Sequence, residues 1–104
     1  MINLVKIWGN WCGPDWTGGQ RVSAQDYQGS WKAPCQDKLD CACRSHDRDC
    51  SHPKGCSKKA DDALIRQALR VSANPITRIF QPEKADAADK IILALSIAKP
   101  FRKR

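Results

Sequence analysis

Residues 41–50 read Cys41-Ala42-Cys43-Arg44-Ser45-His46-Asp47-Arg48-Asp49-Cys50 and are the most informative part of this 104-residue chain. They lie in a segment without glycine or proline, residues 37–51, which we expect to form a helix. Helical spacing places four side chains on one face of this helix: Cys43, His46, Asp47 and Cys50. An inward face of this composition is unusual for a core helix and indicates a functional site.

A second helix is expected over residues 57–72, after the turn-forming residues 52–55. Asp61 falls on its apolar face, whereas Asp62 points away and can pair with Arg66 one turn later. A carboxylate on a core face needs a hydrogen-bonding partner. Asp61 therefore either caps this helix or holds a buried polar group from another helix. The full apolar face comprises Asp61, Leu64, Ile65, Ala68 and Leu69.

The rest of the chain predicts a mainly α protein with a single domain over residues 1–104, because this length has no room for a second domain. Residues 1–36 are rich in turn formers and hold all four tryptophans, so we expect loops with at most short strands there. A C-terminal helix is expected over residues 82–99, because it begins at a proline and another proline follows it. The basic tail Phe101-Arg102-Lys103-Arg104 is expected to fray.

The loop Trp11-Cys12-Gly13-Pro14-Asp15-Trp16-Thr17-Gly18-Gly19 could present backbone oxygens to a cation. Its glycines let the backbone turn carbonyl groups inward, and Ca²⁺ takes about six to eight oxygen ligands. A glycine-rich loop more often only makes turns. The cysteine inside this loop, together with the cysteine beside the His-Asp pair, makes the combination more specific.

Three motifs follow one another along the chain: Cys12-Gly13-Pro14 with Gly18-Gly19, then Cys43-x-x-His46-Asp47, then Lys59-Ala60-Asp61 at the start of an amphipathic helix. In this order they resemble the calcium-dependent phospholipase A2 family, most closely its small, divergent viral, bacterial and invertebrate members. The match covers residues 8–72. The resemblance implies a mainly α fold in which a calcium loop precedes two antiparallel core helices and a C-terminal helix, stapled by disulfides.

The resemblance also implies a role for each matching residue. His46 would be the general base that takes a proton from water, and Asp61 the buried carboxylate that orients it. Ca²⁺ would polarise the ester carbonyl, with the Gly13 amide donating a hydrogen bond there. The implied reaction is hydrolysis of the sn-2 ester of glycerophospholipids. The implied calcium ligands are the backbone carbonyls of Trp11, Gly13 and Asp15 and the carboxylate of Asp47.

The chain departs from the family pattern at two site positions. Cys50 stands where a tyrosine often hydrogen-bonds the buried Asp, and the single tyrosine, Tyr27, lies in the loop region. The sequence does not say which group supports Asp61 instead. Asp15 stands where a glycine is common, which bears on the third carbonyl ligand.

The six cysteines could form disulfides in an oxidising place, or be metal ligands or thiols in a reducing cytosol. The resemblance implies disulfides. Cys12 and Cys43 match the family's cysteines that join the calcium loop to the first helix. The other four, Cys35, Cys41, Cys50 and Cys56, allow three pairings, and the sequence does not choose among them. A bond from Cys50 to Cys56 would close the turn between the helices, and one from Cys35 to Cys41 would pin the entry to the first helix.

Residues 51–104 carry twelve basic and five acidic side chains and account for the whole net charge of +7. A basic half favours an anionic partner, and the resemblance makes that partner an anionic phospholipid bilayer rather than nucleic acid. No secretory signal or membrane span is visible. Because disulfides need an oxidising place, we expect a secreted or virion-associated protein. Four tryptophans could anchor at the headgroup level or fill a small core: Trp8, Trp11, Trp16 and Trp31.

Two other interpretations stay open. Seven Cys and His side chains within residues 35–56 could form a structural zinc module that binds nucleic acid, although the chain has no Cys-x-x-Cys knuckle. The chain could also have the phospholipase-like fold without the activity and act as a binding module, with the altered loop or Cys50 as the cause.

Overall fold

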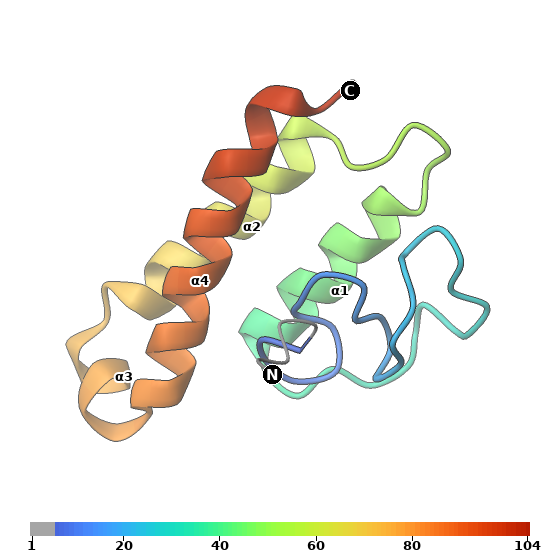
Figure 1. Ribbon diagram of the computed structural model, residues 1–104. Coiled ribbons are helices and arrows are strands. Elements are labelled where there is room, and N and C mark those ends of the chain that lie inside the picture. The colour runs from blue at the N-terminus through green and yellow to red at the C-terminus, as the bar shows by residue number, and fades with distance from the viewer. Residues whose placement is uncertain (1–5) are drawn as a thin grey trace, which may run out of the picture.

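The computed structural model describes residues 6–104, which are mainly helical (Figure 1). Within these residues the loop region contains two isolated β-bridges, Trp8 with Cys12 and Thr17 with Gln20, and no strand. The expectation of a mainly α fold is therefore confirmed. The N-terminal segment that was considered as a secretory signal begins with residues 1–5, and these residues lie outside the described part. The helices are α1 (Lys38–Cys50), α2 (Lys58–Ser72), α3 (Pro75–Phe80) and α4 (Pro82–Ala98), followed by the 3-10 turn η1 (Lys99–Phe101).

The helices that the sequence predicts begin where it supplies a cap. The Asp37 side chain accepts a hydrogen bond from the Asp40 amide at 2.9 Å and starts α1. The Ser57 hydroxyl accepts one from the Ala60 amide at 3.0 Å and starts α2. A proline occupies the first turn of α4, where its missing N–H has no intrahelical partner to lose.

The short helix α3 was not expected, because Asn74-Pro75 reads as a stop signal. In the structure these two residues end α2 and also start the next helix. The Asn74 side chain accepts a hydrogen bond from the Ile76 amide at 2.9 Å, and Pro75 occupies the first turn. Asn followed by Pro can end one helix and start another, so the sequence pattern did not predict this helix.

Helix α2 contacts both α1 and α4, and neighbouring helices run antiparallel (Figure 1). Its buried side chains are Asp61, Leu64 and Ala68, spaced three and four residues apart along a narrow seam. Leu69, expected on the buried face, is 48% exposed because it lies at the edge of that seam. Among the described residues, no helix is both long and apolar enough to cross a membrane.

The tail does not fray as the sequence suggested. The guanidinium of Arg104 donates to the Gly55 carbonyl at 2.7 Å, and the Lys58 amide donates to the Arg104 carbonyl at 3.1 Å. The Gly55 carbonyl of the turn and the Lys58 amide at the start of α2 thus bind the tail. Asp62 also differs from expectation, since its partner is Lys99 of η1 rather than Arg66.

Candidate active site

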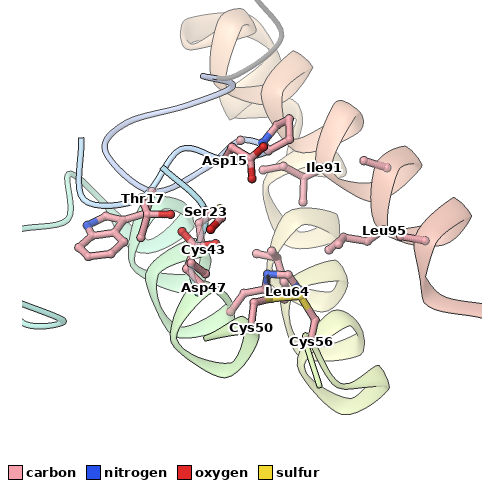
Figure 2. Close-up of a pocket in the computed structure, with 18 of the residues that line it drawn as sticks. Asp15, Thr17, Ser23, Cys43, Asp47, Cys50, Cys56, Leu64, Ile91 and Leu95 are labelled. Carbon is pink, nitrogen blue, oxygen red and sulfur yellow. Dashed lines mark hydrogen bonds between the residues drawn. A yellow bond between two sulfur atoms is a disulfide. The ribbon is translucent and has the colours of Figure 1, made fainter. Parts of the chain in front are cut away.

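A pocket of about 470 Å³ lies between the loop, α1 and α4 (Figure 2). Its apolar wall comes from Leu64 of α2 and from α4, where Ile91 and Leu95 face Asp47 of α1 across the pocket. The lining also includes Gly13 and Asp15 of the loop and His46 and Asp47 of α1. All four side chains predicted to share the inward face of α1 line this pocket: Cys43, His46, Asp47 and Cys50.

The imidazole of His46 is bound to a carboxylate of the next helix. His46 Nε2 lies 2.6 Å from Asp61 Oδ1, and the Asp61 side chain is fully buried. An ionised carboxylate can only accept a hydrogen bond, so Nε2 is the nitrogen that donates to it. The other ring nitrogen, Nδ1, lies 3.5 Å from the sulfur of Cys50. The sequence left open whether Asp61 caps α2 or holds a buried partner. Ser57 is the cap, and Asp61 holds His46.

A second group on Asp61 was not found from the sequence. Arg102, which follows η1, places Nε 2.7 Å from Asp61 Oδ2 and one terminal nitrogen 3.2 Å from Oδ1. This arginine lies 41 residues after Asp61 in the chain. Spacing patterns relate residues only within one element, so they give no sign of such a contact.

Asp47 follows His46 on α1 and carries an unpaired oxygen. Asp47 Oδ2 is the only buried side-chain N or O atom in residues 6–104 without a hydrogen-bond partner. Burial, assisted by the nearby charge of Asp40, raises the pKa of Asp47 to about 9. A carboxylate that is costly to ionise and has a free oxygen fits a site that a cation completes.

Three loop residues line the same pocket: Trp11, Gly13 and Asp15. Within residues 6–104 the carbonyls of Trp11 and Asp15 accept no hydrogen bond, and the Gly13 carbonyl accepts one from the Trp16 amide at 3.3 Å. Asp15 adopts a φ of 53°, the left-handed region that favours glycine. These oxygens and Asp47 are a donor set that fits Ca²⁺, which prefers oxygen ligands.

Asp40 is a site residue that the sequence analysis missed. Its fully buried carboxylate accepts backbone hydrogen bonds from Asn10 at 3.1 Å, Trp11 at 2.9 Å and Gln36 at 2.8 Å. Asp40 stands three residues before Cys43, on the inward face of α1. Its position one turn before Cys43, on the face that carries His46 and Asp47, is a signal that could have found it.

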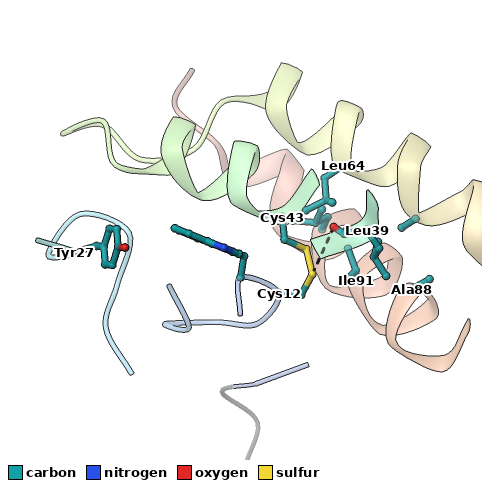
Figure 3. Close-up of a cluster of buried hydrophobic side chains, with 10 residues drawn as sticks. Cys12, Tyr27, Leu39, Cys43, Leu64, Ala88 and Ile91 are labelled. Atoms are coloured by element: carbon teal, nitrogen blue, oxygen red, sulfur yellow. Dashed lines mark hydrogen bonds between the residues drawn. A yellow bond between two sulfur atoms is a disulfide. The ribbon is translucent and has the colours of Figure 1, made fainter. Parts of the chain in front are cut away.

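All six cysteines form disulfides, and the pairs are Cys12–Cys43, Cys35–Cys41 and Cys50–Cys56. The pairing that the resemblance implied for Cys12 and Cys43 is present. Figure 3 shows this disulfide packed among Leu39, Leu64 and Ile91 in the core. It joins the loop to α1 directly behind the pocket.

The sulfur atoms bear on the zinc interpretation. His46, Cys50 and Cys56 offer atoms within 4.8 Å of one another, which is close enough for a shared metal. The two sulfurs are bonded to each other, and zinc needs thiolates as its sulfur ligands. While the disulfide is intact, this cluster is not a zinc site.

The tryptophans do not form an exposed anchor. Trp11 is fully buried, and its ring packs against Tyr27 and Trp31 with centroids 5.6 and 5.8 Å away. Of the two alternatives left open for the tryptophans, Trp11 therefore fills the core. Trp8, Trp16 and Trp31 are partly buried.

No protein-family model, curated protein or solved structure matches the chain. The function of the site is therefore inferred from its residues and their geometry.

Proposed function

We propose that this protein is a calcium-dependent phospholipase A2-like enzyme that hydrolyses the sn-2 ester of glycerophospholipids. One observation carries the proposal. His46, which is bound to the buried Asp61, and Asp47, which carries the unpartnered oxygen, line the same pocket, and part of its wall is apolar. The order of the three sequence motifs supports the same assignment.

In this proposal His46 is the general base. Because Asp61 accepts the Nε2 proton, Nδ1 is the nitrogen that can take a proton from an attacking water. Asp61 fixes the tautomer and the ring orientation, as the third member of a triad does. It also stabilises the imidazolium that forms when His46 accepts the proton.

The calcium ligands would be the Asp47 carboxylate and the carbonyls of Trp11, Gly13 and Asp15. When bound, Ca²⁺ would polarise the ester carbonyl as a Lewis acid. The Gly13 amide makes no hydrogen bond to another backbone group within residues 6–104. It can therefore donate to the ester oxygen as negative charge develops there.

The shape and lining of the pocket suit a lipid. A volume of about 470 Å³ is within the range of ligand pockets, and Leu64, Ile91 and Leu95 offer an apolar surface for an acyl chain. The ester would lie toward His46 and Asp47. A pocket lined by both apolar and polar residues favours an amphiphile over a fully polar substrate.

A bilayer would present that substrate. Leu93, Ile97 and Phe101 are exposed and spaced four residues apart, so they form one apolar stripe along α4 and η1. Each immediately precedes a residue that lines the pocket: Ala94, Ala98 and Arg102. With the basic charge of residues 51–104, this stripe supports binding to an anionic bilayer. Three disulfides are consistent with a secreted or virion-associated protein.

The experiment that tests the proposal measures fatty-acid release from mixed anionic phospholipid vesicles, with calcium and then with chelator. His46→Gln should lower the rate by about 10²-fold or more, because it removes the general base. His52→Gln is the matched control, since His52 is exposed and lies outside the pocket. Asp47→Asn should abolish both calcium binding and hydrolysis.

The decisive negative result is no release from folded, oxidised, calcium-saturated protein. That result would reject the enzyme and leave the interpretation of an inactive binding module. Zinc that co-purifies with free thiols would instead favour the zinc module.

A further inference from the structure

The guanidinium of Arg102 covers the side of the Asp61 carboxylate that His46 leaves open. Arg102 Nε donates to Oδ2 at 2.7 Å, and a terminal nitrogen donates to Oδ1 at 3.2 Å. Oδ1 also accepts the proton of His46 Nε2 at 2.6 Å. Both carboxylate oxygens are thus fixed, one by arginine alone and one by arginine and histidine together.

The contact has the geometry of a directed interaction. A planar guanidinium with two donors defines the plane of a carboxylate, which a single-point ammonium does not. The Asp61 side chain is fully buried, and that of Arg102 is 23% exposed. A buried carboxylate without a partner is strongly unfavourable, and removal of Arg102 would leave Asp61 Oδ2 without its donor.

The segment that carries Arg102 is itself held in place. The next-but-one residue, Arg104, binds the Gly55 carbonyl at 2.7 Å and the Asp49 carbonyl at 3.2 Å. Its own carbonyl accepts the Lys58 amide at 3.1 Å. Residues 102–104 therefore bridge the end of α1, the following turn and the start of α2, and hold the Arg102 guanidinium against Asp61.

We infer that Arg102 is a positioning residue for the His46–Asp61 pair, which sets the plane of the Asp61 carboxylate and through it the orientation of the His46 ring. The inference rests on the proposed function, in which His46 is the general base. It supplies the support of Asp61 that the sequence left unassigned. Without Arg102 the carboxylate can rotate, and His46 Nδ1 is no longer held at one position in the pocket.

The test compares Arg102→Gln, Arg102→Lys and the matched control Lys103→Gln. Lys103 is exposed and forms no ion pair within residues 6–104, so its variant removes one charge from the same segment. The substrate is a short-chain phosphatidylcholine dispersed below its micelle concentration, so that membrane binding does not enter. We expect Arg102→Gln to lower kcat by about 10- to 100-fold, as loss of an outer-shell partner does at metal sites, with KM unchanged. Arg102→Lys should retain part of the parental kcat, and Lys103→Gln should retain all of it.

A second readout does not depend on activity. The short hydrogen bond between His46 and Asp61 should give a strongly downfield imidazole proton in the ¹H NMR spectrum of the parent. We expect this signal to move or disappear in Arg102→Gln and to persist in Lys103→Gln. A parent without fatty-acid release would reject the proposed function, and the NMR comparison would still decide the role of Arg102.

Asp61→Asn completes the test. If Arg102 acts only through Asp61, then Arg102→Gln adds no further loss of kcat in the Asp61→Asn background. A merely structural role predicts the opposite pattern, with a lower Tm for Arg102→Gln but parental kcat and a parental NMR signal, and this would overturn the inference. If Arg102→Gln does not fold, parental kcat and signal in Arg102→Lys would overturn it, because lysine lacks the planar fork.

Discussion

The carboxylate of Asp40 on α1 accepts a hydrogen bond from the backbone amide of Trp11 in the loop, at 2.9 Å. The Cys12–Cys43 disulfide attaches the same stretch of loop to the same helix. Two neighbouring attachments therefore fix the loop on α1. Because α1 also carries His46 and Asp47, one helix sets the position of the candidate base and of the backbone oxygens around it.

Replacing Asp40 should loosen the loop. Asp40→Asn keeps one oxygen but turns an N–H₂ group toward amides that also donate, so hydrogen bonds to Asn10, Trp11 or Gln36 are lost. We expect a loss in unfolding free energy on the order of 3 kcal/mol, measured by denaturant titration. Asp26→Asn, at an exposed loop position, should stay within about 0.5 kcal/mol of the parent. Equal stabilities for the two variants would contradict the anchoring role of Asp40.

Gly9 should not tolerate a side chain. Its φ is 59°, and a Cβ at this position would overlap the carboxylate of Asp40. Gly55 has a φ of 82° but nothing within 4 Å of its Cβ position, so it is the matched control. Gly55→Ala should cost about 1 kcal/mol from backbone strain alone. Gly9→Ala should lower Tm distinctly more, and a smaller effect than at Gly55 would argue against the close approach to Asp40.

The disulfides should differ in their contribution to stability. The Cys12–Cys43 bond spans 31 residues, and by chain entropy its removal should cost about 3–4 kcal/mol. The Cys35–Cys41 bond spans 6 residues, and its removal should cost about 2 kcal/mol. Double Ala variants of each pair, compared by Tm, test the order. Only removal of Cys12–Cys43 should also weaken calcium binding, since only that bond holds the loop at the pocket.

Calcium binding should release a proton. Burial raises the pKa of Asp47 to about 9, so the carboxyl group is protonated at neutral pH when no metal is bound. Ca²⁺ binds the ionised form. Its affinity should therefore rise with pH, by up to about tenfold per unit, and level off above pH 9. Calorimetry in two buffers of different ionisation enthalpy measures the released proton directly, and an affinity unchanged between pH 6 and 8 would contradict a protonated Asp47.

The same shift has a consequence for stability. The pKa of Asp47 is raised above its ordinary value of 3.8, so the folded protein holds the proton more tightly than the unfolded chain. Without calcium, the protonated Asp47 carboxyl group makes its full contribution to the free energy of unfolding below about pH 4. This contribution decreases as the pH rises and is lost once the pH passes 9. Asp47→Asn, which stays neutral, should remove that part of the pH dependence. Thermal melts with chelator over this range provide the measurement.

The apolar stripe on α4 should matter for vesicles alone. Ile97 is 63% exposed near the pocket, and Ile79 is 71% exposed on α3, at the other end of α4 (Figure 1). Ile97→Glu should slow vesicle hydrolysis by about tenfold, through lost apolar contact and added negative charge, and leave short-chain hydrolysis unchanged. Ile79→Glu serves as the control. Equal effects on the two substrates would indicate a damaged pocket rather than weaker membrane binding.

The helical framework was predictable because its signals are local. Asp37 and Ser57 cap α1 and α2, and helical spacing correctly placed Asp61 on a buried face. The alternative that Asp61 only starts its helix was excluded by its contact with His46, which lies 15 residues away in the chain. Helix α3 was not predicted, because Asn74-Pro75 can end one helix and also start the next.

The sequence by itself determined which face of α1 carries the residues that line the pocket, because a helix brings residues three and four apart together whatever surrounds it. It also identified the glycine-rich loop that precedes α1 and the cysteines that could join this loop to the helix. Only the tertiary structure decided how Cys35, Cys41, Cys50 and Cys56 pair and that Asp40 holds the loop on α1. Only the tertiary structure also placed Arg102 on Asp61. Each of these depends on distances between separate elements, and those distances are set by how the whole core packs.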